Sequence, residues 1–257
     1  MAILGIDEVG RGPWAGPLVM GAVILRSPAQ LSEDSDFPEW VSALTDSKKL
    51  TEKKRTELAT QINNLAAATA LGWVSASEID QIGLSQALRL AARRAILKIQ
   101  RQKVPFSEII IDGTVNFLSD TPLTHYVTTL KKADALIKEV SAASIIAKVA
   151  RDDYMHKLFT AYPDYGFERH VGYGTAAHRK ALQDFGPSPS IVSAFVQSLR
   201  FRPISLTMLR GLARHARQPP RHRQIRPRPR PSRRINLQIL LPLKQSALTP
   251  KKQLKNI

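Results

Sequence analysis

The hydrophobic and polar positions along the chain alternate between strand-like runs and helix-like spacings. Apolar runs predict five strands, at residues 3–6, 17–25, 68–75, 108–111 and 125–129. Helical spacing predicts helices at residues 52–65, 84–101, 139–162 and 176–185, and a last helix from residue 191. The loop between the first two runs is short, which favours an antiparallel pair. Strands that alternate with helices predict an α/β fold with a mixed β-sheet flanked by helices.

The clearest amphipathic pattern belongs to residues 84–101. Its apolar stripe consists of Leu84, Leu88, Ala91, Ala95 and Ile99, and the cations outside the stripe are Arg89, Arg93, Arg94 and Lys98. Thr51 and Thr175 are predicted helix caps, and Ser77 is predicted to cap a short turn. Residues 27–46, which are polar and contain proline, and the glycine-rich residues 166–174 are predicted loops.

Composition narrows the class of protein. The chain has 257 residues, 43% of them hydrophobic, and no cysteine, which excludes a disulfide framework and a thiolate metal site. The absence of cysteine is compatible with a reducing cytosol, so we expect a cytoplasmic protein. The first residues lack the basic segment of a signal peptide and reach an acid at Asp7. No apolar run approaches the roughly 18 residues that span a membrane, so we expect no membrane partner.

The net charge of +17 is concentrated at one end of the chain. Residues 1–202, which we call the body, carry 24 Lys and Arg against 21 Asp and Glu, whereas residues 203–257, the basic tail, carry 14 Lys and Arg and no acid. Such a tail favours a polyanion partner, most often nucleic acid, although an anionic membrane surface or a role in solubility also fits. The tail holds 8 of the 17 prolines, so we expect a disordered basic tether.

Carboxylates follow three of the predicted strands. The first run closes on Asp7 and Glu8, the fourth ends at Asp112, and Asp134 comes just after the fifth. Strand ends of one sheet lie near one another, and converging carboxylates repel unless cations compensate them. An all-oxygen ligand set favours Mg²⁺ or Mn²⁺, and two such ions form the site that cuts phosphodiesters.

Two points remain open for the first pair of acids. Asp7 and Glu8 are adjacent, and consecutive strand residues point to opposite faces. They can share a metal site only if the strand ends or twists between them, which the glycine at Gly10 allows. The alternative for this segment is a solvated turn.

Six separated blocks of the sequence carry a family resemblance. In chain order they are G-I-D-E-V-G-R-G-P-W-A-G-P, D-S-K-K-L, I-I-D-G, K-A-D-A, S-A-A-S-I-I-A-K-V-A-R-D and G-Y-G-T-A-A-H. Together they resemble bacterial ribonuclease HII over residues 2–200. The resemblance implies a ribonuclease H-like fold for residues 1–202, with a C-terminal helical part and two Mg²⁺ or Mn²⁺ ions. It also implies an endoribonuclease that hydrolyses the RNA strand of RNA/DNA hybrids. Such an enzyme also incises 5′ of ribonucleotides embedded in duplex DNA, leaving a 3′-hydroxyl and a 5′-phosphate.

The resemblance also assigns roles to individual residues. It implies that the catalytic metal ligands are Asp7, Glu8, Asp112 and Asp134. It further implies that Gly10, Arg11 and Gly12 read the ribose 2′-hydroxyl, and that Tyr173 stacks on the neighbouring deoxyribose. Only the 2′-hydroxyl separates a ribonucleotide from a deoxynucleotide, and glycines let backbone donors approach it closely. The alternative for Tyr173 is an aromatic packed inside its loop.

Other polar residues near these blocks are less specific. Lys48 and Lys49, flanked by Ser47, suit phosphate contacts, and the alternative is solvated surface lysines. For Asp152, an ordinary helix-surface acid or a salt bridge fits as well as a site role. His170 and His178 are more typical of structural histidines. The chain departs from the family pattern at Val171, where the family has lysine, and at Trp14, where a smaller aliphatic residue is common.

One apolar segment interrupts the basic tail. Residues 238–243, which begin at Gln238 and end at Leu243, resemble the glutamine-and-leucine hexapeptide that binds the bacterial sliding clamp. The alternative is a segment that folds back on the body. A different function would be nucleic-acid binding by an idle body, against which the presence of all four carboxylates argues. We expect a monomer that acts on RNA/DNA hybrids and on duplex DNA containing ribonucleotides.

Overall fold

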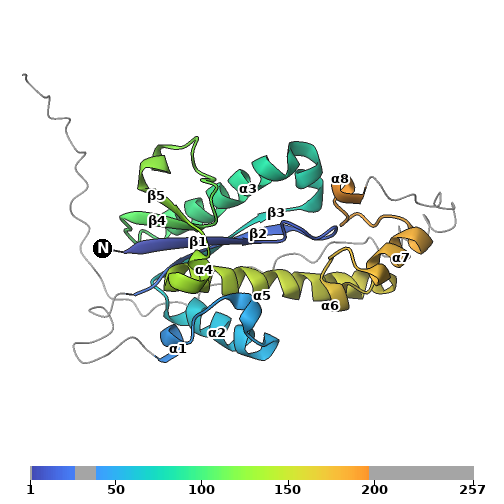
Figure 1. Ribbon diagram of the computed structural model, residues 1–257, viewed down its shortest axis with the longest axis horizontal. Helices are drawn as coiled ribbons and strands as arrows, with labels where there is room; N and C mark the ends of the chain where they lie inside the picture. Colours follow the sequence, from blue (N-terminus) through green and yellow to red (C-terminus); the bar gives the residue numbers. More distant parts are fainter. Residues whose placement is uncertain (1, 27–38, 197–257) are drawn as a thin grey trace, which may run out of the picture. The chain divides into compact units, whose positions relative to one another are not determined.

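Five strands form one mixed sheet in the order β3-β2-β1-β4-β5 in a computed structural model of the chain, which describes residues 2–26 and 39–196 (Figure 1). The strands are β1 (Ile3–Val9), β2 (Leu18–Ile24), β3 (Ala68–Val74), β4 (Glu108–Asp112) and β5 (Val127–Leu130). The pairs β1–β2 and β2–β3 are antiparallel, and β1–β4 and β4–β5 are parallel. The predicted mixed α/β sheet and its antiparallel first pair are confirmed.

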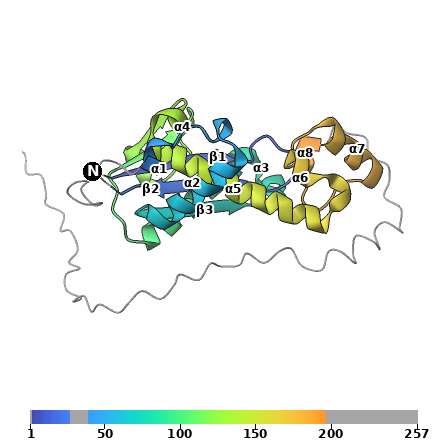
Figure 2. The same cartoon turned by 90° about the horizontal axis from the view of Figure 1, so that it is seen from below.

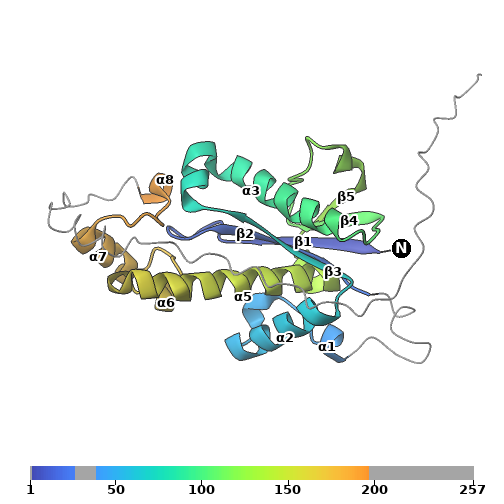
Figure 3. The ribbon, with the colours of Figure 1, turned by 180° about the vertical axis from the view of Figure 1, so that it is seen from behind.

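Helices cover both faces of this sheet. The α-helices are α1 (Glu39–Ser42), α2 (Glu52–Leu65), α3 (Ala76–Arg101), α4 (Ala133–Leu136), α5 (Lys138–Ala161), α6 (Phe167–His170), α7 (Ala176–Phe185) and α8 (Ser193–Val196). The 3₁₀ turns are η2 (Ser47–Lys49), η3 (Pro122–Tyr126) and η4 (Pro163–Tyr165). Figure 3 shows α3 on one side of the sheet and α5, with α2 beyond it, on the other. The first strand is therefore covered on both faces.

Several local predictions were wrong. The first strand continues three residues beyond its predicted end at residue 6. The predicted loop at residues 166–174 contains the short helix α6. The predicted loop at residues 27–46 contains α1 within its described part. Ser75 rather than Ser77 caps α3, because its hydroxyl accepts the Glu78 N–H while the Glu78 carboxylate accepts the Ser75 N–H. That helix begins at Ala76 and is interrupted at Gly83, where φ is 76°. The fifth strand begins two residues later than predicted, because η3 occupies residues 122–126.

Alternation along β1 decides which side chains meet which helix. Leu4 and Ile6 are fully buried in the core that includes the apolar stripe of α3. Gly5 faces α5, and a Cβ there would overlap the backbone of Glu139. Gly21 on β2 allows the same close approach, because a Cβ there would overlap the Ala143 backbone. The long helix therefore lies directly against the face of β1 on which the parity places Asp7.

A second core lies at the C-terminal half of α5. Its fully or nearly fully buried side chains are Ala15, Met155, Leu158, Tyr165, Phe167, Ala181, Leu182, Ile191 and Val196. Figure 2 shows the helices α6, α7 and α8 gathered at that end of α5. Ala15, which follows the glycine loop of the first strand, takes part in this core and pairs with Ile191 through an isolated bridge. We call this part of the protein, together with the loop 10–17, the C-terminal module.

The chain divides into two units, Met1–Pro220 and Arg221–Ile257. The predicted boundary after residue 202, the basic tail and the segment from Gln238 to Leu243 lie outside the described residues, so the division into domains stays a prediction. No helix in residues 2–26 and 39–196 is both long and apolar enough to cross a membrane.

Candidate active site

The first two acids lie inside β1, which continues through them to Val9. Asp7 is 7% exposed, and its Oδ1 accepts the backbone N–H of Glu8 at 2.8 Å. The Ser144 hydroxyl of α5 also hydrogen-bonds to the Asp7 carboxylate. The strand does not end between the two acids, yet their carboxylates are close enough to repel each other.

The other two acids are linked through the backbone. Asp112 ends β4, and its Oδ1 accepts the N–H of Ala133 at 2.7 Å. Asp134 is the next residue in the same short helix, α4, which the sequence pattern had not predicted. Lys132, the residue before α4, has a left-handed backbone conformation, with φ of 60°. The hydrogen bond from Ala133 therefore fixes the segment that carries Asp134 beside the end of β4.

Electrostatic interactions connect these four carboxylates, which we call the acidic cluster. Burial first, and then the charges of Glu8 and Asp112, raise the pKa of Asp7 to about 8. Burial also raises the pKa of Glu8; Arg11 opposes this shift and Asp112 adds to it. The pKa of Asp134 is raised by burial first and then by Asp112 and Asp46. Because Asp112 acts on all three, the four acids form one electrostatic group, in which Arg11 and Lys48 offset the repulsion only in part.

The donor set of the acidic cluster fits divalent cations. Oε2 of Glu8 is buried without a hydrogen-bond partner, and Oε1 reaches only the exposed Arg11, at 3.6 Å. Carboxylate oxygens are the ligands that Mg²⁺ and Mn²⁺ prefer. In the described part of the chain, no three Asp, Glu or His side chains are gathered as in an ion-bound site.

The glycine loop after β1 meets the loop that carries Tyr173. Gly12 is exposed, and a Cβ there would lie 3.9 Å from the Tyr173 ring. Gly10 is buried with φ of +97°, and a Cβ there would overlap the Pro17 carbonyl. The ring of Tyr173 is 45% exposed, which contradicts the reading of a packed loop aromatic. Two predicted site residues that are far apart in sequence thus present one open surface.

Arg151 holds these two loops together. Its side chain is fully buried, and its guanidinium donates to three backbone carbonyls: Nε to Pro17 at 3.0 Å, Nη2 to Ala15 at 2.9 Å and Nη1 to Val171 at 2.9 Å. The first two carbonyls belong to the glycine loop, and the third lies two residues before Tyr173. Val171 has φ of 42°, in the left-handed region that β-branched residues avoid.

The two histidines support the same loop from inside. His170 and His178 are buried and stack at a centroid distance of 4.5 Å. Nδ1 of His178 lies 3.0 Å from the Tyr173 carbonyl, and Trp14 packs against the same ring at 5.8 Å. These contacts agree with the structural role expected for the histidines. Asp152 pairs with Lys148 at 2.7 Å, which agrees with a helix salt bridge.

The segment predicted to bind phosphate lies near Asp134 of the acidic cluster. Lys48 and Lys49 are exposed, and Lys48 is close enough to Asp134 to lower its pKa against the effect of burial. Ser47 is only 3% exposed, and its hydroxyl lies 3.0 Å from that of Ser144. The Ser47 hydroxyl therefore has an internal partner, and a phosphate contact through it stays a prediction.

Sequence reasoning missed Asp46, Ser144 and Arg151 as residues of this region. Asp46 adds negative charge beside Asp134 and caps η2. A signal for Ser144 was present, because Ser141 and Ser144 are three residues apart among small residues and so share the helix face that packs on the sheet. For Arg151 no local signal exists, because a buried and an exposed arginine look alike in a helical pattern.

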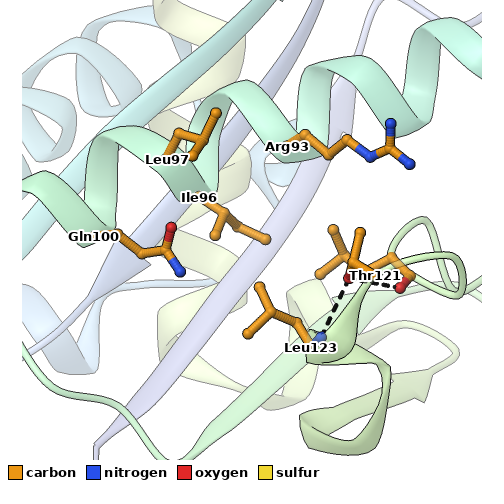
Figure 4. A pocket seen from close by; sticks show the side chains of 7 residues that line it. Arg93, Ile96, Leu97, Gln100, Thr121 and Leu123 are labelled. Atoms are coloured by element: carbon orange, nitrogen blue, oxygen red, sulfur yellow. Dashed lines mark hydrogen bonds between the residues drawn. The ribbon is translucent and has the colours of Figure 1, made fainter. Parts of the chain in front are cut away.

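A pocket on the opposite side of the sheet is not this site. It lies between α3 and the segment that leads to β5, and Figure 4 shows its lining residues, which are Arg93, Ile96, Leu97, Gln100, Leu118, Thr121 and Leu123. The lining contains no carboxylate, and Arg93 is already paired with Asp120. This pocket therefore offers no acid–base or metal chemistry.

Comparisons with known proteins agree with this geometry. The family model described as Ribonuclease HII matches residues 4–200. Ribonuclease HII of Dichelobacter nodosus is 43% identical over 187 residues, covering 73% of this chain and 90% of that protein. Ribonuclease HII of Thermus thermophilus is 39% identical over 210 residues, covering 82% of this chain and 91% of that protein.

Solved structures share the fold. Ribonuclease H2 from Pyrococcus horikoshii aligns with a TM-score of 0.60 at 25% identity, covering 85% of this chain and 100% of that chain. The PCNA:RNase HII complex from Archaeoglobus fulgidus aligns with a TM-score of 0.62 at 26% identity, covering 80% of this chain and 98% of that chain. These alignments confirm the predicted ribonuclease H-like fold.

Proposed function

Because this chain belongs to the ribonuclease HII family, whose members cleave the RNA of RNA/DNA hybrids, we propose that it hydrolyses phosphodiesters at the acidic cluster with two divalent ions. The observation that carries this proposal is the set of four carboxylates in mutual repulsion, with Oε2 of Glu8 buried and unpartnered. Mg²⁺ or Mn²⁺ held there by Asp7, Glu8, Asp112 and Asp134 would stabilise negative charge on the attacking and leaving oxygens.

The chain's own groups have distinct tasks in this scheme. Asp7 and Glu8 project from opposite faces of β1, so they approach the scissile phosphate from two directions. Asp112 interacts electrostatically with both of them and with Asp134. Lys48, exposed beside Asp134, supplies a cation for a substrate phosphate. Cleavage on the 5′ side of the ribonucleotide leaves a 3′-hydroxyl and a 5′-phosphate.

We further propose that the enzyme incises duplex DNA at single ribonucleotides. Gly10, Arg11 and Gly12 would read the 2′-hydroxyl, and Tyr173 would stack on the deoxyribose of the next nucleotide. Two observations support this assignment: the open space over Gly12 and the exposed ring of Tyr173 beside it. A backbone donor needs such space to reach a hydroxyl on a bound sugar.

The test is cleavage of three matched duplexes that carry an RNA strand, one ribonucleotide, or no ribonucleotide. We expect Mg²⁺- or Mn²⁺-dependent cleavage of the first two and none of the third, with the nick 5′ of the ribonucleotide. Binding of all three without cleavage would favour the second candidate, an idle nucleic-acid-binding body. Cleavage of the hybrid alone would retain the ribonuclease H activity and remove the ribonucleotide incision.

We also propose that the tail carries a contact to the sliding clamp. The support is the segment from Gln238 to Leu243 and the solved complex of an archaeal relative with PCNA. A peptide that inserts leucines into a preformed pocket gains avidity from a flexible tether. The test is a titration of residues 235–244 against the clamp of the same organism, beside the peptide with Gln238→Ala and Leu241→Ala. Equal or undetectable binding by both would refute the contact.

A further inference from the structure

Two buried hydroxyls connect Asp7 to the segment that carries Lys48. Ser144 lies on the face of α5 that packs against β1, and its hydroxyl hydrogen-bonds to the Asp7 carboxylate. Its oxygen also lies 3.0 Å from the Ser47 hydroxyl oxygen. Ser47 is 3% exposed and Ser144 is 8% exposed, so water does not compete freely for these bonds. The two serines form an internal bridge between a strand and a surface turn.

Counting the hydroxyl protons shows which group donates in each hydrogen bond of the bridge. An ionised carboxylate only accepts hydrogen bonds, and each serine has one hydroxyl proton. When Asp7 is ionised, as it must be to bind a cation, Ser144 donates its proton to Asp7. The bond between the two serines must then use the proton of Ser47. The chain of donors therefore runs from Ser47 to Ser144 to Asp7, and removing either hydroxyl leaves the bridge incomplete.

The turn that carries Ser47 is itself held from two further sides. The Asp46 side chain accepts the Lys48 N–H at 2.9 Å, which fixes the start of η2. Arg55 of α2 donates through Nη1 to the Ser47 carbonyl at 3.0 Å and also to the Leu50 carbonyl. The backbone on both sides of Lys48 is thus anchored, and the lysine stays beside Asp134.

We propose that Ser47 and Ser144 are positioning residues that lock the Asp7 carboxylate to the Lys48 turn, so that metal binding and phosphate binding share one rigid frame. The inference rests on the proposed two-ion function. Neither serine touches the reacting phosphate in this arrangement. Ser144 orients a metal ligand directly, and Ser47 acts on that ligand only through Ser144. The hydroxyl of Ser47 therefore affects metal affinity although it contacts no carboxylate.

The experiment measures Mn²⁺ binding by calorimetry on the full chain without nucleic acid, together with the midpoint of thermal unfolding. Loss of an outer-shell partner costs about 10–100-fold in metal affinity, which we expect for Ser144→Ala. One neutral hydrogen bond corresponds to about 2–10-fold, which we expect for Ser47→Ala. The double variant should bind Mn²⁺ no more weakly than Ser144→Ala, because both changes break one chain of donors.

Cleavage of an RNA/DNA hybrid supplies a second readout. Raising the Mn²⁺ concentration should restore most of the kcat of Ser144→Ala, whereas Lys48→Ala should raise KM at every Mn²⁺ concentration. Ser188→Ala is the matched control, because Ser188 is also buried, at 4% exposed, and its hydroxyl has no partner. It should leave Mn²⁺ affinity and kcat unchanged.

The outcomes distinguish a failure of the serine bridge from a failure of the proposed two-ion function. If the wild-type chain binds no Mn²⁺, the proposed function fails and the bridge fails with it. If the wild type binds Mn²⁺ and Ser47→Ala binds it equally well, the bridge alone is refuted. Multiplicative losses in the double variant would also refute it, because they would mean that the serines act separately. If Ser144→Ala lowers the unfolding midpoint, the Mn²⁺ affinity of Ser47→Ala, which changes the surface turn, decides whether the bridge exists.

Discussion

Two buried charged centres in this protein differ in how completely they are satisfied. Arg151 in the C-terminal module is fully buried, and each of its three guanidinium nitrogens donates to a backbone carbonyl. In the acidic cluster, Asp7 is 7% exposed, the pKa of Asp7 is raised to about 8, and Oε2 of Glu8 has no partner. A buried charge with a complete set of partners supports structure, whereas one with an incomplete set marks a place for a ligand.

The largest effect is expected from Asp7→Asn. The change removes a charged group from the proposed metal site, so activity in Mg²⁺ should fall by more than the roughly 10–100-fold caused by losing an outer-shell partner. The fold should persist, because asparagine relieves repulsion from Glu8 and Asp112. Hybrid cleavage and thermal unfolding of the metal-free protein measure the two effects. Near-normal activity in Mg²⁺ would contradict the assignment of Asp7 to the metal site. The proposed difference between Asp7 and Arg151 would then not hold.

Arg151→Met should have the opposite profile, with stability as its main loss. Leaving a buried acceptor unsatisfied costs about 1–3 kcal/mol, and three carbonyls lose their donor, so we expect a loss of at least about 3 kcal/mol in urea unfolding. Arg169→Met is the control, because Arg169 is exposed and its surface pair with Glu168 is worth about 0–1 kcal/mol. Equal losses in the two variants would contradict a special role for Arg151.

The sequence predicted the acidic cluster better than the arginine centre for a physical reason. Asp7 and Asp112 each come directly after the apolar run of their strand, although only Asp112 ends its strand. Neighbouring strands of one sheet bring such positions together, so local patterns suffice. Arg151 lies one position before Asp152, which forms an ordinary helix pair with Lys148. Which of these neighbouring side chains is buried depends on where the loops pack against α5. That packing involves segments more than 130 residues apart in the chain.

Short elements were also beyond the reach of sequence patterns. The strands β2, β3 and β4 and the helices α2, α5 and α7 were predicted to within about one residue at each end, because each repeats its period several times. The strand β1 continues three residues beyond its predicted end. The helices α1 and α4 have four residues each, too few for a repeat. Since α4 carries Asp134, the sequence indicated this proposed ligand by its place after a strand and not by the element that holds it.

His178 offers a third buried group, whose incomplete set of partners keeps it neutral. It is fully buried, and Nε2 has no hydrogen-bond partner. Burial, with a further contribution from His170, lowers the pKa of His178 to about 4, below its ordinary value of 6.5. The unfolded chain therefore binds a proton near pH 6.5 that the folded protein binds only near pH 4. The contribution of neutral His178 to the free energy of unfolding is fully present above pH 6.5. It is lost as the pH falls from 6.5 to 4, by about 3 kcal/mol in total.

Urea unfolding at pH 7.5 and pH 4.5 measures this loss. In His178→Phe the difference between the two pH values should shrink by most of that amount, because phenylalanine cannot bind the proton. His125→Gln changes an exposed histidine and should leave the difference as it is in the wild type. An unchanged difference in His178→Phe would mean that His178 titrates alike in both states and that its burial carries no electrostatic cost.

The smallest effect on stability distinguishes two glycines of one loop. Gly10 has φ of +97° and packs against Arg151, so Gly10→Ala should cost at least about 1–3 kcal/mol in urea unfolding. Gly12 has room for a Cβ, so Gly12→Ala should change stability by less than about 0.5 kcal/mol. If the space over Gly12 serves the ribose, Gly12→Ala should nevertheless lose preference for a single ribonucleotide over an all-DNA duplex. A stable Gly12→Ala protein with wild-type preference would place the reading of the 2′-hydroxyl elsewhere, while a stable Gly10→Ala protein would show that Arg151 does not require this loop geometry.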